Sequence, residues 1–181
     1  MTEKILLNEK EIDITITRLC WELIENHDNF ENTCIIGLQP RGVFFADRIV
    51  EKLKQLTKKN KFCYGKLDIT FFRDDFGRRD ELLIANKTDI NFIVENKRVI
   101  FIDDVLYSGR SIRAALSAIG SFGRPASIEL MTFINRRFSR ELPISPKYIG
   151  KEVDSIASER VNVNWAGQTG SDSVTLVSVE K

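Results

Sequence analysis

The sequence predicts an α/β fold, in which a mostly parallel β-sheet is flanked by helices, and two observations predict it. The first is the apolar run at 99–102, which is rich in β-branched residues and typical of a strand buried in a parallel sheet. The second is the order of the next segments: Asp103 and Asp104, a turn with two serines and a glycine at 108–111, and then a helical apolar pattern. This order places acidic groups and a helix N-terminus at the carboxyl edge of the sheet, where α/β proteins bind ligands.

The other elements can be assigned in chain order from the same two periodicities. Residues 8–26 carry apolar side chains at helical intervals, with Asn8 as the N-cap and Glu11 three residues later. Glycine and proline at 123–125 end the helix that comes after the central turn. The remaining predicted elements are a strand at 33–37, a helix at 43–56, a strand at 62–72, a strand at 127–134, and closing strands at 148–153, 160–165 and 174–179.

Length and composition are those of one globular domain that covers 1–181. The chain has 181 residues, of which 43% are hydrophobic and 29% charged, and this is enough for a sizeable core. The 27 basic and 26 acidic residues give a net charge of +1, which argues neither for nor against a polyanionic partner. No apolar run approaches the length of a membrane span, and the charged N-terminus lacks a signal-peptide core, so we expect no membrane segment.

The cysteines and the single histidine are predicted to be structural. Cys20, Cys34 and Cys63 are odd in number and lack metal-type spacing, which is typical of small buried residues in a reducing cytoplasm. His27 lies in a polar stretch and is expected to be a solvated turn residue. On this interpretation, a histidine-based catalytic triad and a multi-histidine metal site are both excluded.

The residues around the central turn suit a ribose 5-phosphate. Backbone N–H groups and the hydroxyls of Ser108 and Ser111 lie at the positive end of the helix dipole and form a cradle for phosphate. Two carboxylates would repel that phosphate unless a ligand group separates them, and ribose hydroxyls can donate to Asp103 and Asp104, directly or through a divalent cation. A Walker-B strand is one alternative, but the chain has no G-x-x-x-x-G-K-[ST] partner. The other is a purely structural strand and helix with solvated acids.

Two further loops have ligand-binding character. The junction at 37–42 places two glycines around Pro40 and Arg41, which suits close approach of the backbone to an anion. Residues 73–91 are rich in Asp, Arg and Asn and predict a long surface loop. Loops of this length inside compact domains are usually functional or disordered.

The stretch 103–111, Asp-Asp-Val-Leu-Tyr-Ser-Gly-Arg-Ser, resembles the signature with which type I phosphoribosyltransferases bind phosphoribosyl pyrophosphate (PRPP). Within that family it is similar to the PyrR-type pyrimidine operon regulators, which are also uracil phosphoribosyltransferases. Similar segments at 67–75, 123–128, 140–144 and 148–151 extend the resemblance over most of the chain. It implies a Rossmann-like sheet with a flexible loop and a small C-terminal hood.

The resemblance also implies an activity and its residues: uracil and PRPP, with Mg²⁺ bound together with PRPP, give UMP and pyrophosphate. Such a reaction needs no nucleophile from the protein, since catalysis comes from holding the reactants and stabilising charge. Asp103, Asp104 and Arg73 are the implied catalytic residues, and the two aspartates reach the metal only indirectly, with PRPP. The implied substrate-binding residues are Pro40, Arg41, Asp103, Asp104, Val105, Leu106, Tyr107, Ser108, Gly109, Arg110, Ser111, Arg136 and Val161.

The resemblance gives the two further loops their roles. The loop at 37–42 corresponds to the pyrophosphate loop of the family, which often contains a cis peptide bond. Gln39 and Pro40 stand where a Lys-Thr type of loop is common, and an X–Pro bond tolerates the cis form best, so we predict a cis Gln39–Pro40 bond. Residues 73–91 correspond to a lid that keeps water from the reacting centre. Arg73, Arg78 and Arg79 are candidates to meet the leaving pyrophosphate.

A second function is implied by the resemblance, namely UMP-responsive regulation through leader mRNA. Here the chain departs from the family: Trp21 replaces a common histidine, Ser145 a common arginine, and 135–139 an Asp-Arg-Gly-His-type segment with one residue more. Arg140 and Lys151 are the remaining candidates for RNA contacts, and each lost cation weakens RNA binding. A nucleotide-sensing RNA attenuator with little or no catalysis and a purine phosphoribosyltransferase are the alternatives. A homodimer or larger homo-oligomer is expected from the resemblance alone.

Overall fold

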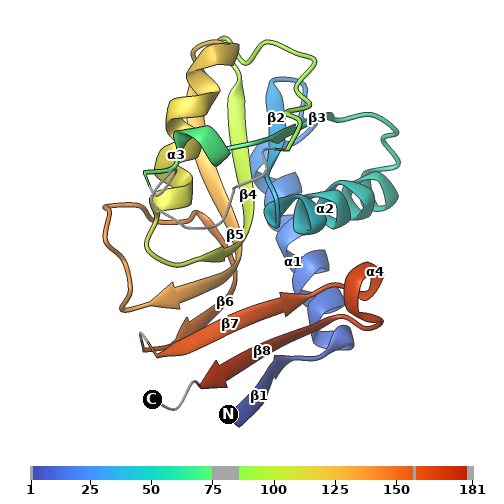
Figure 1. Ribbon diagram of the computed structural model, residues 1–181. Coiled ribbons are helices and arrows are strands. Elements are labelled where there is room, and N and C mark those ends of the chain that lie inside the picture. The colour runs from blue at the N-terminus through green and yellow to red at the C-terminus, as the bar shows by residue number, and fades with distance from the viewer. Residues whose placement is uncertain (1, 75–85, 157, 179–181) are drawn as a thin grey trace.

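A five-stranded parallel sheet forms the centre of the protein, as a computed structural model shows for residues 2–74, 86–156 and 158–178 (Figure 1). The strand order is β3-β2-β4-β5-β6, which confirms the predicted α/β fold. The strands are β2 (Thr33–Leu38), β3 (Cys63–Leu67), β4 (Arg98–Leu106), β5 (Ser127–Arg137) and β6 (Tyr148–Asp154).

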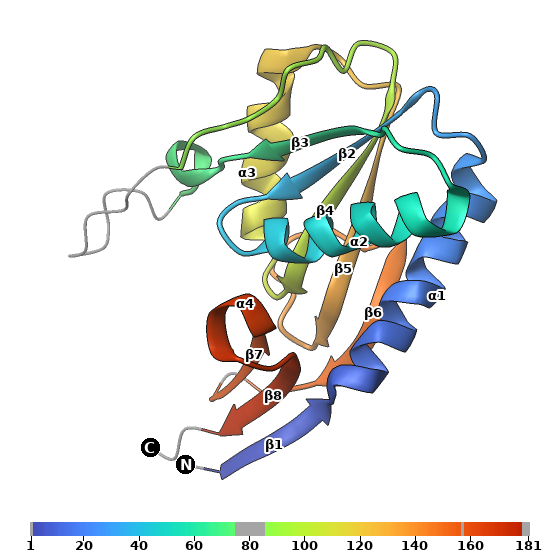
Figure 2. The same ribbon diagram turned by 90° about the vertical axis from the view of Figure 1, so that its right-hand side faces the viewer.

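Helices cover both faces of this sheet (Figure 2). Helices α1 (Glu9–His27) and α2 (Gly42–Thr57) pack on one face, and α3 (Arg110–Ile119) packs on the other. Along β4, Ile100 and Ile102 belong to the core beneath α1 and α2, while Val99 and Phe101 belong to the core beneath α3. Both faces of the strand are therefore buried, which is why its apolar run is continuous rather than alternating.

A second sheet forms the predicted hood, but it is not built from the C-terminal segment alone. Its order is β1-β8-β7, all antiparallel, with β1 (Thr2–Leu7), β7 (Glu159–Asn164) and β8 (Ser173–Ser178). Strand β1 was not predicted. A short helix, α4 (Ala166–Thr169), replaces the simple turn expected between the last two strands. Trp165 fastens the hood to the main core, because its ring stacks on Phe45 and tilts against Phe133.

Helix α1 begins as predicted. The Asn8 side chain accepts from the Glu11 N–H at 3.0 Å, and the Glu11 carboxylate accepts from the Asn8 N–H at 2.8 Å, which completes a capping box.

Among the described residues, no helix combines the length and the apolar character that a membrane crossing requires.

Several strand boundaries differ from the prediction. Strand β4 continues through Asp103 and Asp104 to Leu106, because it stays paired with β5 past the apolar run. By contrast, the strand predicted over 62–72 stops early, at Leu67, and residues 70–72 form a 3₁₀ turn. A local side-chain bond explains the early stop, since the Asp68 carboxylate accepts from both the N–H and the hydroxyl of Thr70.

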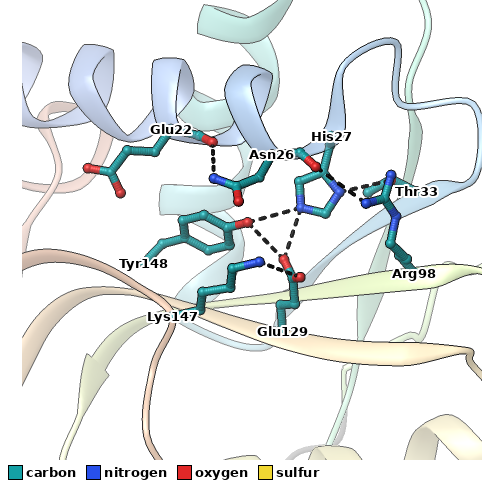
Figure 3. Close-up of polar contacts among 8 residues, drawn as sticks. All are labelled: Glu22, Asn26, His27, Thr33, Arg98, Glu129, Lys147 and Tyr148. Atoms are coloured by element: carbon teal, nitrogen blue, oxygen red, sulfur yellow. Dashed lines mark hydrogen bonds and ion pairs between the residues drawn. The ribbon is translucent and has the colours of Figure 1, made fainter.

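The prediction for His27 was wrong. Its side chain is buried at the end of α1 rather than solvated, with Nδ1 3.0 Å from the Thr33 hydroxyl (Figure 3). Its Nε2 lies 2.9 Å from a carboxylate oxygen of Glu129 and 3.0 Å from the hydroxyl of Tyr148. Lys147 completes this group with an ion pair to Glu129 at 2.7 Å. We call these five residues the amino-edge cluster, because they gather where strands β2, β5 and β6 begin.

Candidate active site

The candidate site lies at the opposite, carboxyl edge of the same sheet and begins with the acidic pair, Asp103 and Asp104. Both side chains lie near the end of β4 and are buried, with 9% and 6% of their surfaces exposed. Oδ1 of Asp103 accepts from the Asp104 N–H at 3.0 Å, and Oδ1 of Asp104 accepts from the Val105 N–H at 2.7 Å. Neither carboxylate forms an ion pair with another residue in the part of the chain that the structure describes.

Electrostatics makes this pair receptive to a ligand. Burial, and then the charge of Asp104, raises the pKa of Asp103 well above its ordinary value. Burial also raises the pKa of Asp104, against the opposing charge of Arg41. Two buried, neighbouring carboxylates repel one another, so hydroxyl donors or a cation placed against them are favoured.

A cavity of about 290 Å³ opens beside Asp103, which lines it, whereas the predicted site residues Pro40, Arg41 and Asp104 do not. At one end lies the turn before α3, where Gly109 has a φ of +93° and serves as N-cap without any side-chain cap. The first N–H groups of α3 have no intrahelical partners, as at other helix N-termini that bind phosphate, and the Arg110 N–H donates to the Ser108 hydroxyl at 3.4 Å. The cavity is lined by Arg73, Asp103, Val105, Leu106, Tyr107, Ser108, Gly109, Arg110, Ser111, Ile112 and Glu141. Nine of the predicted site residues are thus brought together around one open space.

The loop between β2 and α2 approaches the acidic pair closely. A Cβ atom at Gly42 would lie 2.6 Å from the Ile102 carbonyl oxygen and 3.0 Å from a carboxylate oxygen of Asp103, so only glycine fits there. The sequence pattern indicated Gly42 only as part of the loop and did not reveal this contact. The Gln39–Pro40 peptide bond is cis, as predicted. Arg41 is exposed and close enough for its charge to lower the pKa of Asp104.

Arginines stand at the mouth of the cavity. Arg73 lines it, and one of its guanidinium nitrogens is 3.4 Å from the Ser111 hydroxyl. Arg110 also lines it and forms ion pairs with Asp74 and Glu141. Glu141 is a lining residue that sequence reasoning did not single out, and only its place in a similar segment could have indicated it. The lid predicted for 73–91, including Arg78 and Arg79, falls largely on 75–85, outside the described residues.

Arg136 and Val161 do not line this cavity. The Arg136 side chain is buried and donates to the Ser155 hydroxyl at 2.7 Å and to the carbonyls of Ile156 and Glu159. Its guanidinium also lies over the Tyr107 ring, 4.1 Å from the centroid. Arg136 therefore connects the turn before α3 (108–111, called the phosphate turn below) to the segment that enters the hood. Val161 lies in this hood and is buried on β7.

The two candidate RNA contacts make internal hydrogen bonds. Arg140 donates to the carbonyl of Tyr107 and to the Asn135 side chain, so it stands behind the phosphate turn. Lys151 donates to the carbonyl of Leu6 at 3.2 Å. Both side chains are half-buried, and part of their hydrogen-bonding capacity is used within the fold.

Comparison with known proteins places this geometry in a family. Residues 3–170 match the phosphoribosyl transferase domain. The chain is 39% identical over 175 residues to a protein of Elusimicrobium minutum named "Bifunctional protein PyrR", and 97% of each chain is covered. A protein of the same name from Clostridioides difficile is 41% identical over 177 residues, covering 97% of this chain and 99% of that one. Among solved structures, a hypoxanthine phosphoribosyltransferase from Staphylococcus aureus superimposes with a TM-score of 0.66 at 20% identity, over 83% of this chain and 77% of that one, which shows a shared fold.

Proposed function

Since this chain belongs to the phosphoribosyl transferase family and to its PyrR branch, we propose that it converts uracil and PRPP to UMP and pyrophosphate. One observation carries the proposal: an open cavity joins the N-terminus of α3 and its serine–glycine turn to the buried carboxylate of Asp103. A ribose 5-phosphate needs an anion site at one end and hydroxyl acceptors at the other.

The proposed roles rest on this placement. The N–H groups and hydroxyls of the 108–111 turn hold the 5-phosphate, and the acidic pair accepts hydrogen bonds from the ribose hydroxyls. As C1 gains positive charge, the same carboxylates stabilise it across the cavity. Arg41 and Arg73 lie on the side where the pyrophosphate leaves, and their cations offset its growing charge. Arg136 and the chain near Val161 border the base, through Tyr107 and the hood.

Mg²⁺ fits this site as part of the substrate. The described residues hold no group of three or more His, Cys, Asp or Glu side chains that could bind an ion, whereas the acidic pair offers the hard carboxylate oxygens that Mg²⁺ prefers. Bound with PRPP, the ion would offset the negative charge of the leaving pyrophosphate. The homo-oligomer and the cytoplasmic location stay predictions.

The activity is tested by product identification. The protein is mixed with PRPP and Mg²⁺, and uracil, hypoxanthine and guanine are offered separately. We expect UMP and pyrophosphate from uracil only. Turnover of a purine with uracil inert would overturn the base assignment, and tight UMP binding without turnover would favour a sensor instead.

A second candidate function is UMP-responsive binding of leader mRNA, supported by the shared name of the PyrR relatives, which calls them bifunctional. The test is a salt series of binding to a pyrimidine leader RNA, with and without UMP. A steep fall of affinity with salt supports phosphate contacts, and a shallow slope with weak affinity argues against regulation. Lys151→Ala is the informative variant, because its charge lies outside the nucleotide cavity.

A further inference from the structure

Two cysteines lie opposite one another on neighbouring strands, away from the acidic pair. Cys34 is the second residue of β2 and Cys63 the first of β3, and they are register partners in the parallel pairing of these strands. Both are free thiols, and their sulfur atoms are 2.6 Å apart. Paired residues on adjacent strands are separated by about 4.8 Å, and the Cα separation in disulfides is roughly 4.4–6.8 Å. The backbone therefore already has the spacing that a disulfide needs.

The two thiols differ in access. Cys34 is fully buried in the core beneath α3, whereas Cys63 is half-buried at the start of an outer strand of the sheet. Cys63 also lines a cavity of about 650 Å³, together with Lys59, Lys61 and Tyr64. A small polar reagent can thus reach Cys63 more readily than Cys34.

The hydrogen bond between the two sulfur atoms also makes the pKa values of the two thiols differ, and the more accessible thiol has the lower pKa. It lowers the pKa of Cys63, against the effect of burial, and it raises the pKa of Cys34, with burial adding to the rise. Because the thiolate is the reactive form, Cys63 is the better nucleophile of the two.

We propose that Cys34 and Cys63 form a reactive dithiol that hydrogen peroxide oxidises to an intramolecular disulfide. The Cys63 thiolate attacks one peroxide oxygen, the O–O bond breaks, and the released hydroxide takes up a proton to leave as water. Cys63 is then a sulfenic acid. The Cys34 sulfur attacks the Cys63 sulfur, the S–O bond breaks, and a second water leaves with the thiol proton. Two thiols lose two electrons and two protons, and one peroxide becomes two waters.

Cys20 provides the internal control. Its side chain is fully buried on α1, its thiol is 3.6 Å from the Ile49 carbonyl, and burial raises its pKa to about 12. Inert, buried thiols of this kind are expected to survive oxidant.

The experiment counts thiols by mass. Reduced full-length protein is treated with hydrogen peroxide, unfolded, alkylated with N-ethylmaleimide and weighed intact. The three cysteines should give three adducts before oxidation and one afterwards, and dithiothreitol should restore all three. Peptide mapping should find Cys34 linked to Cys63.

The variants are judged by the same thiol count, so their results do not depend on whether the protein is an active transferase. Cys20→Ser should fall from two adducts to none, and Cys63→Ser should keep two throughout. Wild-type protein that keeps three adducts, gains oxygen without losing thiol pairs, or links only between chains on a non-reducing gel would overturn the proposal. Because the wild-type result decides by itself, a variant that fails to fold does not weaken the test.

Discussion

The two edges of the parallel sheet each hold a group of polar side chains, and the two groups differ in how their charges are balanced. At the amino edge, every charge of the cluster has a partner: Glu129 accepts from Lys147 and Tyr148 and lies against His27 (Figure 3). At the carboxyl edge, the acidic pair consists of two carboxylates of the same sign beside an open cavity.

This difference distinguishes a structural group from a binding group. Burial by itself would raise the pKa of Glu129, but bonds from Lys147 and Tyr148 and the nearby His27 lower it. The charges of the amino-edge cluster are therefore balanced without a bound ligand. The raised pKa of Asp103 indicates the opposite situation. Burial and the charge of Asp104 destabilise its ionised carboxylate, which a bound hydroxyl donor or cation would stabilise.

The largest effect is expected from replacing both carboxylates of the acidic pair. Asp103→Asn with Asp104→Asn keeps the shape but removes the charge that the ribose hydroxyls and C1 require. We expect kcat/KM for PRPP to fall by about 100-fold or more. Steady-state kinetics with uracil measures it, and wild-type turnover in this variant would refute the roles assigned to both residues.

The same variant should be more stable than the wild type. A carboxyl whose pKa is raised in the folded state contributes stability below its ordinary pKa of 3.8 and loses it as the pH rises. The stability gained by the double variant should thus be larger at pH 8 than at pH 5, as urea denaturation at both pH values measures. A variant less stable than the wild type at pH 8 would contradict this account.

Removal of Arg41 should have a smaller effect on turnover. Arg41→Ala deletes an exposed cation that faces Asp104 and the proposed pyrophosphate position, so we expect kcat/KM to fall by about 10- to 100-fold. Arg124→Ala, an exposed arginine in the loop before β5, is the matched control and should leave turnover unchanged. Equal losses in both variants would show a general charge effect.

At the amino edge, a similar change should alter stability and leave chemistry intact. Glu129→Gln removes the charge that Lys147 and His27 contact, and we expect it to lower the free energy of unfolding by about 1–3 kcal/mol. PRPP turnover at a temperature where the variant is folded should match the wild type. Glu25→Gln, on the exposed side of α1, is the control and should change stability by less than about 0.5 kcal/mol.

The smallest effect is a pH slope from His27. Burial lowers its pKa below 6.5, against the opposing charge of Glu129 and with help from Arg98 and Lys147. The unfolded chain then binds a proton that the folded chain does not, so stability should fall as the pH drops below about 6.5. His27→Gln should flatten this slope. Since His27 is the only histidine, its ring signals in an NMR titration report the same pKa directly, and a value above 6.5 would contradict the prediction.

Most of the sheet and the carboxyl-edge site could be predicted because their signals are local. The apolar run, the acidic pair and the serine–glycine turn are contiguous in the chain, so they lie close together in space once the strand and the helix form. His27 could not be placed, since Glu129 and Tyr148 lie 102 and 121 residues away. Strand β1 was missed for the same reason, because its strand partner, β8, lies at the far end of the described chain. The resemblance implied Arg136 as a substrate-binding residue, but its internal partners could not be predicted, since the carbonyls that accept from its guanidinium belong to a segment about twenty residues later.

The hood joins the first strand of the chain to the last. Thr2 lies opposite Ser178, and β1 has no other strand partner among the described residues. During synthesis on the ribosome, β1 emerges before β8 and stays unpaired until β8 has been translated, whereas the parallel sheet can assemble earlier. The nascent protein thus acquires its phosphate turn before its hood, and the region around Val161 becomes complete only after β8 has been translated.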